Sequence, residues 1–239
     1  MRKIFVTSID GSRVTLTGDS HAHLAYALRS RVGDEVILCC DKIDYTCRIT
    51  SITKTETRLE VLSFNAVDTE PKTQITLFFA LLKGDKNDFV IQKCTELGAS
   101  EFVPFVSRNC ERGAQSIKKE RLSKIAEEAA KQCGRGYVPK VNDPIGFDDV
   151  VSALGAFDLV VFPYEKADKP DLKSFLRSVS GEKVAVIVGS EGGFTDEEAA
   201  LLSAAGVTPV TLGKRIMRAE TASVAVLSAL TYEFGEWEK

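Results

Sequence analysis

Two stretches near the C-terminus decide the fold of this chain: 184–195, VAVIVGSEGGFT, and 207–222, VTPVTLGKRIMRAETA. Each joins an apolar run typical of a buried strand to a glycine-bearing loop, and a helical pattern follows. Strands that alternate with helices in this way predict an α/β domain with a parallel sheet covered on both faces. Open α/β sheets bind ligands at the carboxyl ends of their strands. We therefore expect these two loops to line a functional site.

The same alternation reaches back to residue 74. Asp85 stands where a capping side chain would begin a helix, and Thr195 and Glu198 have the spacing of a capping box. Further buried strands are predicted at 75–82, 102–106, 159–162 and 207–212, and helices at 86–97, 116–133, 195–205 and 220–234. Residues 74–239 are therefore predicted to form one α/β domain.

The first 70 residues follow a different pattern. Turn signals separate short β-rich segments, and one short helix is predicted at about 21–29. These segments lie at 4–6, 13–17, 35–39, 44–49 and 57–62. Several short strands at this spacing predict a small β-barrel. Residues 65–73, which contain Pro71, are typical of a linker, so we expect two domains, 1–70 and 74–239.

Composition excludes several classes of protein. The 239 residues carry a net charge of −3 and 44% are hydrophobic, which is typical of a soluble globular protein. The longest apolar runs are too short to span a bilayer. The N-terminus enters a strand pattern directly, so we expect no signal peptide and a cytoplasmic location. Six cysteines include no CxxC pair and only two histidines accompany them, so we expect reduced thiols and no metal site.

A local excess of positive charge contrasts with the acidic average. From Arg108 to Lys140, nine basic residues oppose four acidic ones. A focused patch of this kind attracts a phosphate backbone. The alternative is a solvated amphipathic helix face, which is the commoner meaning of a charge run.

The residue types in the two loops narrow the choice of ligand. The glycines at 189, 192 and 193 allow a ligand to approach the backbone, but the carboxylate of Glu191 would repel a phosphate. Neither a Walker lysine nor a complete GxGxxG pattern is present. The second loop gathers Lys214, Arg215 and Arg218, which are typical of a functional loop. Neutralisation of helix ends is the alternative, and it explains Glu220 better than it explains two arginines.

Together these segments resemble the RsmE family. GSEGGF and LGKRIMRAETA are similar to its GPEGGF and LGxRILRxETA signatures, with Ser190 and Lys214 in place of prolines whose loss affects loop rigidity. Residues 83–98 and 128–135 resemble its KGD…QKxTELG and EAxxQxxR stretches. The resemblance implies a SPOUT-class α/β domain with a deep trefoil knot and a PUA-like N-terminal barrel. It also implies a homodimer that uses S-adenosylmethionine to make N3-methyluridine in 16S ribosomal RNA of the small subunit.

The resemblance further implies roles for individual residues. Arg218 would hold the uracil oxygens as negative charge develops, while Glu191 or Glu220 would act as the base or orient Arg218. Cofactor-binding positions would be Phe162, Gly189, Glu191, Gly192, Gly193, Leu212, Gly213, Ile216 and Met217. Contacts to RNA would come from Arg29, Arg108, Arg112, Arg135, Lys118, Lys119 and Lys124.

Two alternatives to this function remain open. One is a related enzyme that methylates a ribose 2′-hydroxyl or a guanine, and the other is a non-catalytic RNA-binding protein of ribosome assembly. The sequence leaves undecided the target nucleotide, the general base, and whether free RNA or an assembled subunit is the substrate.

Overall fold

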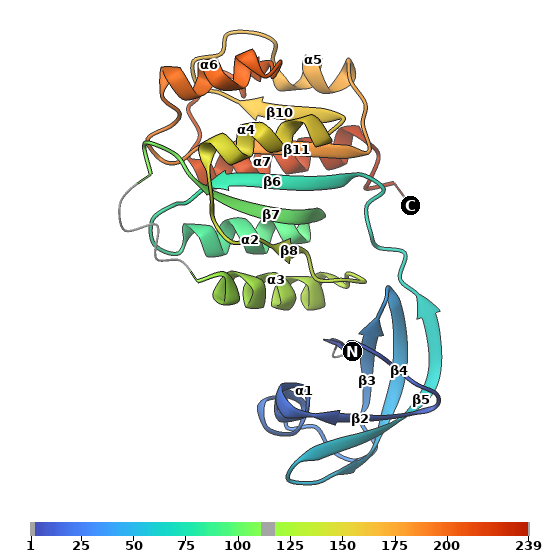
Figure 1. Ribbon diagram of the computed structural model, residues 1–239. Coiled ribbons are helices and arrows are strands. Elements are labelled where there is room, and N and C mark those ends of the chain that lie inside the picture. Colours follow the sequence, from blue (N-terminus) through green and yellow to red (C-terminus); the bar gives the residue numbers. More distant parts are fainter. Residues whose placement is uncertain (1–2, 111–117, 239) are drawn as a thin grey trace. The chain divides into compact units, whose positions relative to one another are not determined.

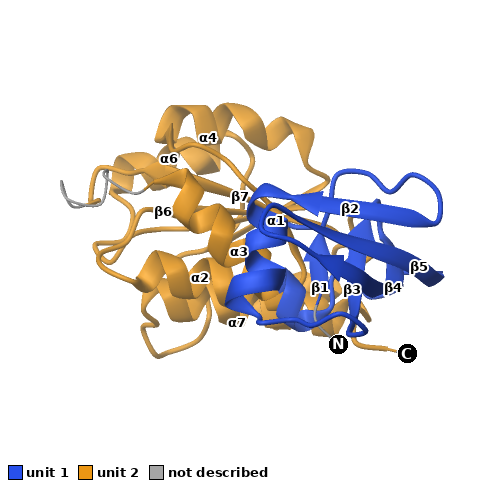
Figure 2. Ribbon diagram, turned by 90° about the horizontal axis from the view of Figure 1, so that it is seen from below, with its two compact units in different colours: residues 1–70, 130–138 blue, residues 71–129, 139–239 orange. Residues whose placement is uncertain are grey.

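A computed structural model of the protein describes residues 3–110 and 118–238. The chain forms two compact units, which Figure 2 shows in different colours. The smaller unit comprises residues 1–70 together with 130–138, and the larger comprises 71–129 and 139–239. The chain divides close to residue 70, as expected, but the smaller unit also includes residues 130–138, which were expected in the larger one. Among the described residues, no helix is long and apolar enough to cross a membrane.

The larger unit is built on a seven-stranded sheet in which every recorded pairing is parallel. The strand order is β12-β10-β11-β6-β7-β8, and β9 pairs with β7. The strands are β6 (Gln74–Ala80), β7 (Ala99–Val106), β8 (Lys140–Val141), β9 (Ile145–Gly146), β10 (Leu159–Pro163), β11 (Lys183–Val188) and β12 (Pro209–Val210). The predicted α/β architecture with a parallel sheet is confirmed.

Helices follow the strands and cover both faces of this sheet (Figure 1). Helices α2 (Lys86–Glu96), α5 (Leu172–Arg177) and α7 (Ala219–Glu233) pack together on one face. Helices α4 (Phe147–Ala153) and α6 (Asp196–Ala204) pack together on the other. A 3₁₀ turn (Leu154–Ala156) follows α4, and α3 (Lys119–Cys133) lies in sequence between β7 and β8. Because both faces are covered, β6 and β11 are apolar almost throughout.

A cluster of aromatic side chains packs between the sheet and the loop that follows β11. The ring of Phe162 packs edge-on against Phe194 with centroids 5.1 Å apart, and it stacks on Tyr164 at 5.4 Å. Phe105 and Phe147 contact Phe194 from the other side. The loop that carries Phe194 is therefore anchored to the hydrophobic core.

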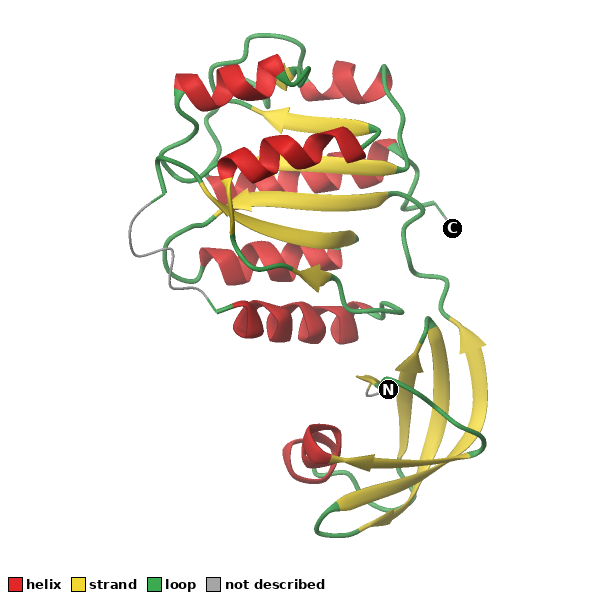
Figure 3. Cartoon of the chain, in the orientation of Figure 1, coloured by secondary structure: helices red, strands yellow, loops and turns green. Residues whose placement is uncertain are grey.

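The smaller unit consists mainly of strands, as Figure 3 shows. Its five strands have the order β1-β3-β4-β5-β2. They are β1 (Lys3–Phe5), β2 (Arg13–Thr17), β3 (Glu35–Cys40), β4 (Ile43–Ile52) and β5 (Glu56–Ala66), with α1 (Gly18–Ala22) and a π-helical turn (His23–Ala27) after β2. Alternate residues of β2, such as Val14 and Leu16, are buried against a separate apolar core. The five predicted strands are present, and β5 runs four residues further than expected, into the predicted linker.

A buried ion pair fastens residues 130–138 within the smaller unit. The guanidinium of Arg135 donates to the carboxylate of Glu70 at 2.8 Å, and these side chains are only 4% and 10% exposed. Glu70 also accepts the backbone N–H of Gly136 at 2.7 Å. The guanidinium lies 4.7 Å from the centre of the Tyr137 ring. Because this group is buried and paired, a contact of Arg135 with RNA phosphates would require its guanidinium to leave Glu70.

Some local predictions also need correction. Asp85 makes no capping hydrogen bond at α2; instead the side chain of Asn87 bonds both the N–H and the C=O of Leu82. Strand β12 is only two residues long. Helices α4 and α5 were not predicted, because each is too short to show a clear helical period. The capping box of Thr195 and Glu198 is confirmed by two reciprocal hydrogen bonds.

Candidate active site

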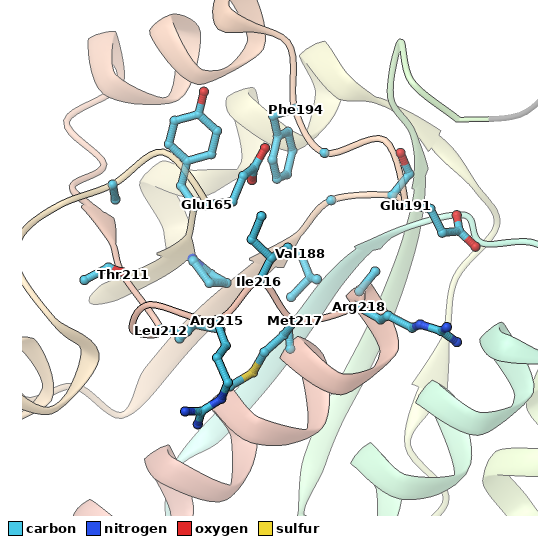
Figure 4. A pocket seen from close by; sticks show the side chains of 18 of the residues that line it. Glu165, Val188, Glu191, Phe194, Thr211, Leu212, Arg215, Ile216, Met217 and Arg218 are labelled. Atoms are coloured by element: carbon cyan, nitrogen blue, oxygen red, sulfur yellow. The ribbon is translucent and has the colours of Figure 1, made fainter.

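A pocket of about 790 Å³ opens at the carboxyl ends of β10, β11 and β12. It is lined by the loops that follow these strands, 163–168, 188–194 and 211–218, and by Lys86 at the start of α2. Figure 4 shows side chains from these loops facing a common space. A volume of a few hundred to a thousand cubic ångströms is usual for a small-molecule site. The two loops predicted from sequence therefore converge on one pocket, together with a third loop.

The loop 189–195 is held rigidly by its surroundings. A side chain at position 189 would collide with the Phe194 ring, because a Cβ atom there would lie 2.8 Å from the ring. The N–H of Gly193 donates to the carbonyl of Ser190 at 3.0 Å, and Gly193 has a φ of +67°. The Asn109 side chain donates to the carbonyls of Gly192 and Gly193. Glycine is thus required here for both close packing and backbone conformation.

The loop 211–218 is fastened at its base and exposed at its tip. Thr211 exchanges backbone hydrogen bonds with Pro170 and Leu172. Beyond it, Gly213 has a φ of +99°, and the side chain of Ile216 is 86% exposed. Arg218 is the N-cap residue that precedes α7, and its side chain is exposed at the pocket. The tip of this loop therefore presents the apolar side chain of Ile216 and, near it, the cationic side chain of Arg218 to a ligand or a partner.

A cluster of charged groups occupies the end of the pocket near α2 and α7. The ammonium of Lys86 donates to Glu191 Oε1 at 2.7 Å, and the backbone N–H of Lys83 donates to the same oxygen at 3.2 Å. The hydrogen bond to Glu191 raises the pKa of Lys86, and the charge of Glu220 adds to this while that of Arg218 opposes it. Lys86 is thus close enough to Arg218 and Glu220 for their charges to affect its pKa.

The pKa of Glu191 reflects two opposing influences. Burial alone would raise the pKa of its carboxyl group. The hydrogen bond from Lys86 and the backbone N–H donors outweigh this effect and lower the pKa below its ordinary value. Glu191 is therefore held as a carboxylate that is already well supplied with donors, which makes it a poor proton acceptor.

Glu220 has the opposite character. It lies in the first turn of α7, and its Oε2 atom is buried without a hydrogen-bond partner among the described residues. A buried carboxylate oxygen without a donor is energetically unfavourable, so it has unused capacity to accept a hydrogen bond. Glu220 lies outside the ring of residues that line the pocket.

Most of the predicted cofactor positions line this pocket. They are Gly189, Glu191, Gly192, Gly193, Leu212, Gly213, Ile216 and Met217, and Arg218 joins them. Phe162 does not, because it is fully buried and packs against Phe194 and Tyr164, and its neighbour Pro163 lines the pocket instead. Ser190, at the position of a family proline, has a buried hydroxyl without a partner among the described residues. Sequence reasoning assigned no role to Lys86, whose contact with Glu191 spans 105 positions.

The residues predicted to contact RNA are distributed differently. Arg108 is exposed, and its backbone N–H donates to Glu198 at the start of α6. Lys118 and Lys124 are exposed, and Lys119 pairs with Asp143 at 3.0 Å. Arg29 is exposed in the smaller unit, and Arg112 lies outside the described residues. In the part of the chain that the structure describes, no three metal-ligating side chains gather.

We expect Lys86→Met to raise the pKa of Glu191, because it removes the strongest donor to that carboxylate. In the wild type, this lowered pKa stabilises the fold above the unfolded-state pKa of about 4.3, and the stabilisation is lost as the pH falls through the folded-state pKa. The variant should therefore show less loss of stability on acidification. A carboxyl NMR titration of Glu191 measures the shift directly. Lys93→Met, which removes a separate pair with Glu96, should leave Glu191 unchanged.

Comparison with known proteins places this fold and pocket in a class. Residues 69–231 match the RNA methyltransferase domain family. A ribosomal RNA small subunit methyltransferase E from Bacillus subtilis is 34% identical over 230 residues, which cover 92% of this chain and 90% of the relative. The chain therefore belongs to the ribosomal RNA small subunit methyltransferase E family.

Two solved structures share the fold over almost their whole length. A ribosomal RNA small subunit methyltransferase E from Neisseria gonorrhoeae, bound to S-adenosylmethionine, is 29% identical with a TM-score of 0.87, and the match covers 97% of each chain. A protein of Legionella pneumophila, also solved with this cofactor, is 28% identical with a TM-score of 0.84, and the match covers 96% of each chain.

Proposed function

We propose that the protein is an S-adenosylmethionine-dependent methyltransferase that modifies N3 of a uridine in 16S ribosomal RNA. The observation that carries this proposal is the single pocket formed by loops 189–195 and 211–218, with Arg218 at its edge. Family membership and the cofactor bound to the Neisseria relative support it.

The residues of the pocket fit S-adenosylmethionine. Val188, Phe194, Leu212 and Met217 offer apolar surface for an adenine ring, and the glycine loop exposes backbone groups for hydrogen bonds. The carboxylates lining the pocket suit a ligand that carries a sulfonium and an ammonium group. When bound, the cofactor supplies an electrophilic methyl group.

The protein must also prepare uracil for reaction, because N3 of neutral uracil carries a proton. Arg218 has the donors to stabilise the negative charge that spreads onto the uracil oxygens when this proton leaves. Of the two candidate carboxylates, Glu191 lines the pocket but already accepts two hydrogen bonds, whereas Glu220 Oε2 has no donor among the described residues but lies outside the pocket lining. Glu220 would therefore act by orienting Arg218 rather than by contacting uracil N3. Lys86 and Glu191 then serve to fix the loop and balance the charge beside Arg218.

The mass spectrum of ribosomal RNA from cells with and without the gene tests this function. The expected result is the loss of one methyl group from the base of a uridine in 16S RNA. A missing ribose or guanine methyl group would instead establish one of the two alternatives. Unchanged RNA together with no binding of S-adenosylmethionine would favour a non-catalytic role in ribosome assembly.

The exposed basic residues of α3 and its N-terminal flank support contact with RNA phosphates. We expect reversal of Lys118, Lys119 and Lys124 to glutamate to weaken RNA binding and to make its salt dependence shallower by about two to three in log–log slope. Filter binding over a salt series measures both quantities. Reversal of the exposed Lys173 and Lys183 should have little effect. If the two sets of reversals had equal effects, the basic residues of α3 would be only a solvated helix face without a role in RNA binding.

The finer assignments of fold and assembly belong to the same proposal. The strand order, with β12 outside β10 while α7 packs on β11, is compatible with a trefoil knot, a rare topology. The N-terminal sheet would be the PUA-like barrel that assists RNA binding. The exposed side chains of Ile216 and Tyr232 support a homodimer, which sedimentation equilibrium would detect. Thiols without disulfides accord with the cytoplasm.

A further inference from the structure

Glu165 is an acidic residue that lines the pocket. It lies in the loop after β10, between two residues that are anchored elsewhere. Tyr164 donates its backbone N–H to Val210 at 3.0 Å and its hydroxyl to Asp196 at 3.4 Å. Lys166 donates to the same Asp196 oxygen at 2.5 Å. With the loop fixed in this way, the Glu165 side chain lines the pocket (Figure 4).

The carboxylate of Glu165 lies against the glycine loop. A Cβ atom at position 193 would stand 2.5 Å from Glu165 Oε1, so the carboxylate lies directly beside this glycine and would have to shift if position 193 carried a side chain. Gly193 is required for its positive φ, which other residues rarely adopt. The Glu165 carboxylate thus lies between the loop after β10 and the glycine loop.

Glu165 differs from the other acidic residues of the site in its lack of partners. Glu191 is paired with Lys86, but Glu165 is exposed and has no hydrogen bond or ion pair among the described residues. A carboxylate has two oxygens that accept hydrogen bonds from neighbouring hydroxyl groups on a ligand. Its two carboxylate oxygens are thus available to accept hydrogen bonds from a ligand in the pocket.

The position of Glu165 indicates which part of a ligand it meets. Figure 4 shows Glu165 beside Phe194, on the opposite side of the pocket from Glu191 and Arg218. If methyl transfer takes place near Arg218, the nucleoside end of the cofactor lies toward Glu165. The ribose of a nucleoside presents two adjacent hydroxyl groups, and acidic side chains bind such groups in other nucleotide sites.

We propose that Glu165 is a cofactor-binding residue whose carboxylate accepts hydrogen bonds from the ribose hydroxyls. This inference rests on the proposed function, because it takes S-adenosylmethionine as the ligand. It adds a specificity element in the loop after β10, outside the two glycine-bearing loops.

Calorimetric titration with two ligands tests the assignment. S-adenosylhomocysteine contains both the nucleoside and the amino-acid half, whereas 5′-methylthioadenosine lacks the amino acid. We expect Glu165→Gln to weaken binding of both ligands by about tenfold or more, because a charged acceptor is lost from the same nucleoside. Glu182→Gln removes an exposed charge before β11, at the opposite end of that strand, and should leave both affinities unchanged.

A ligand without the ribose 2′-hydroxyl sharpens the test. It should bind the wild type more weakly than 5′-methylthioadenosine, and Glu165→Gln should reduce its affinity by a smaller factor. A loss confined to S-adenosylhomocysteine would place the contact on the amino-acid half and overturn the assignment, as would unchanged affinity for both ligands. Wild-type protein that binds neither ligand would instead overturn the proposed function, so the two failures are distinguishable.

Discussion

Replacement of Arg218 by lysine is expected to lower kcat for methyl transfer at least tenfold while leaving the affinity for S-adenosylmethionine unchanged. The guanidinium presents a planar fork of donors to the uracil oxygens, and an ammonium group keeps the charge but loses that geometry. Replacement by alanine removes the charge as well, so a loss of about 10²–10³ is expected, which is typical for one oxyanion donor. Single-turnover methylation of a 16S fragment measures kcat, and calorimetry measures the affinity.

Arg215→Lys is the matched control for this prediction. Arg215 belongs to the same loop and is also exposed, but Figure 4 shows its side chain directed away from that of Arg218. Its replacement should change kcat by less than about twofold if charge stabilisation requires an aligned donor. Turnover of Arg218→Lys equal to that of the wild type would remove Arg218 from the mechanism.

The second large effect concerns stability. Glu70→Gln is expected to lower the free energy of unfolding of the smaller unit by about 3 kcal/mol, because the buried guanidinium of Arg135 loses its counter-charge. Glutamine retains one acceptor oxygen, so the loss lies at the lower end of the range for breaking a buried pair. Urea unfolding followed by hydrogen exchange at residues 130–138 measures the change locally.

A solvated ion pair of the same chemistry provides the comparison. Arg177 pairs with Glu233 at 3.2 Å, but the arginine side chain is 61% exposed. Glu233→Gln should therefore cost less than about 1 kcal/mol. If the two glutamine variants were equally stable, the Arg135–Glu70 pair would not fasten residues 130–138, and the case against an RNA contact by Arg135 would weaken.

Sequence patterns predicted the strands and longer helices well, because these features are local. The apolar run before Gly189 predicts a buried strand on its own, and Thr195 with Glu198 predicts a helix start from neighbouring residues alone. The basic stretch, in contrast, was treated as a unit, yet Lys124 is exposed whereas Arg135 is buried. Residue type and spacing do not report burial when the partner lies as far away as Glu70.

The sequence by itself therefore determined the α/β class, the division of the chain near residue 70 and the two glycine-bearing loops of the pocket, whereas the place of residues 130–138 in the smaller unit came from the structure. Only the tertiary structure decided that the loop after β10 and the start of α2 complete that pocket with Glu165 and Lys86. It also decided that Glu191 is already paired whereas an oxygen of Glu220 is not. The physical reason is that periodicity and capping act over a few residues, whereas strand order brings together groups separated by more than a hundred positions.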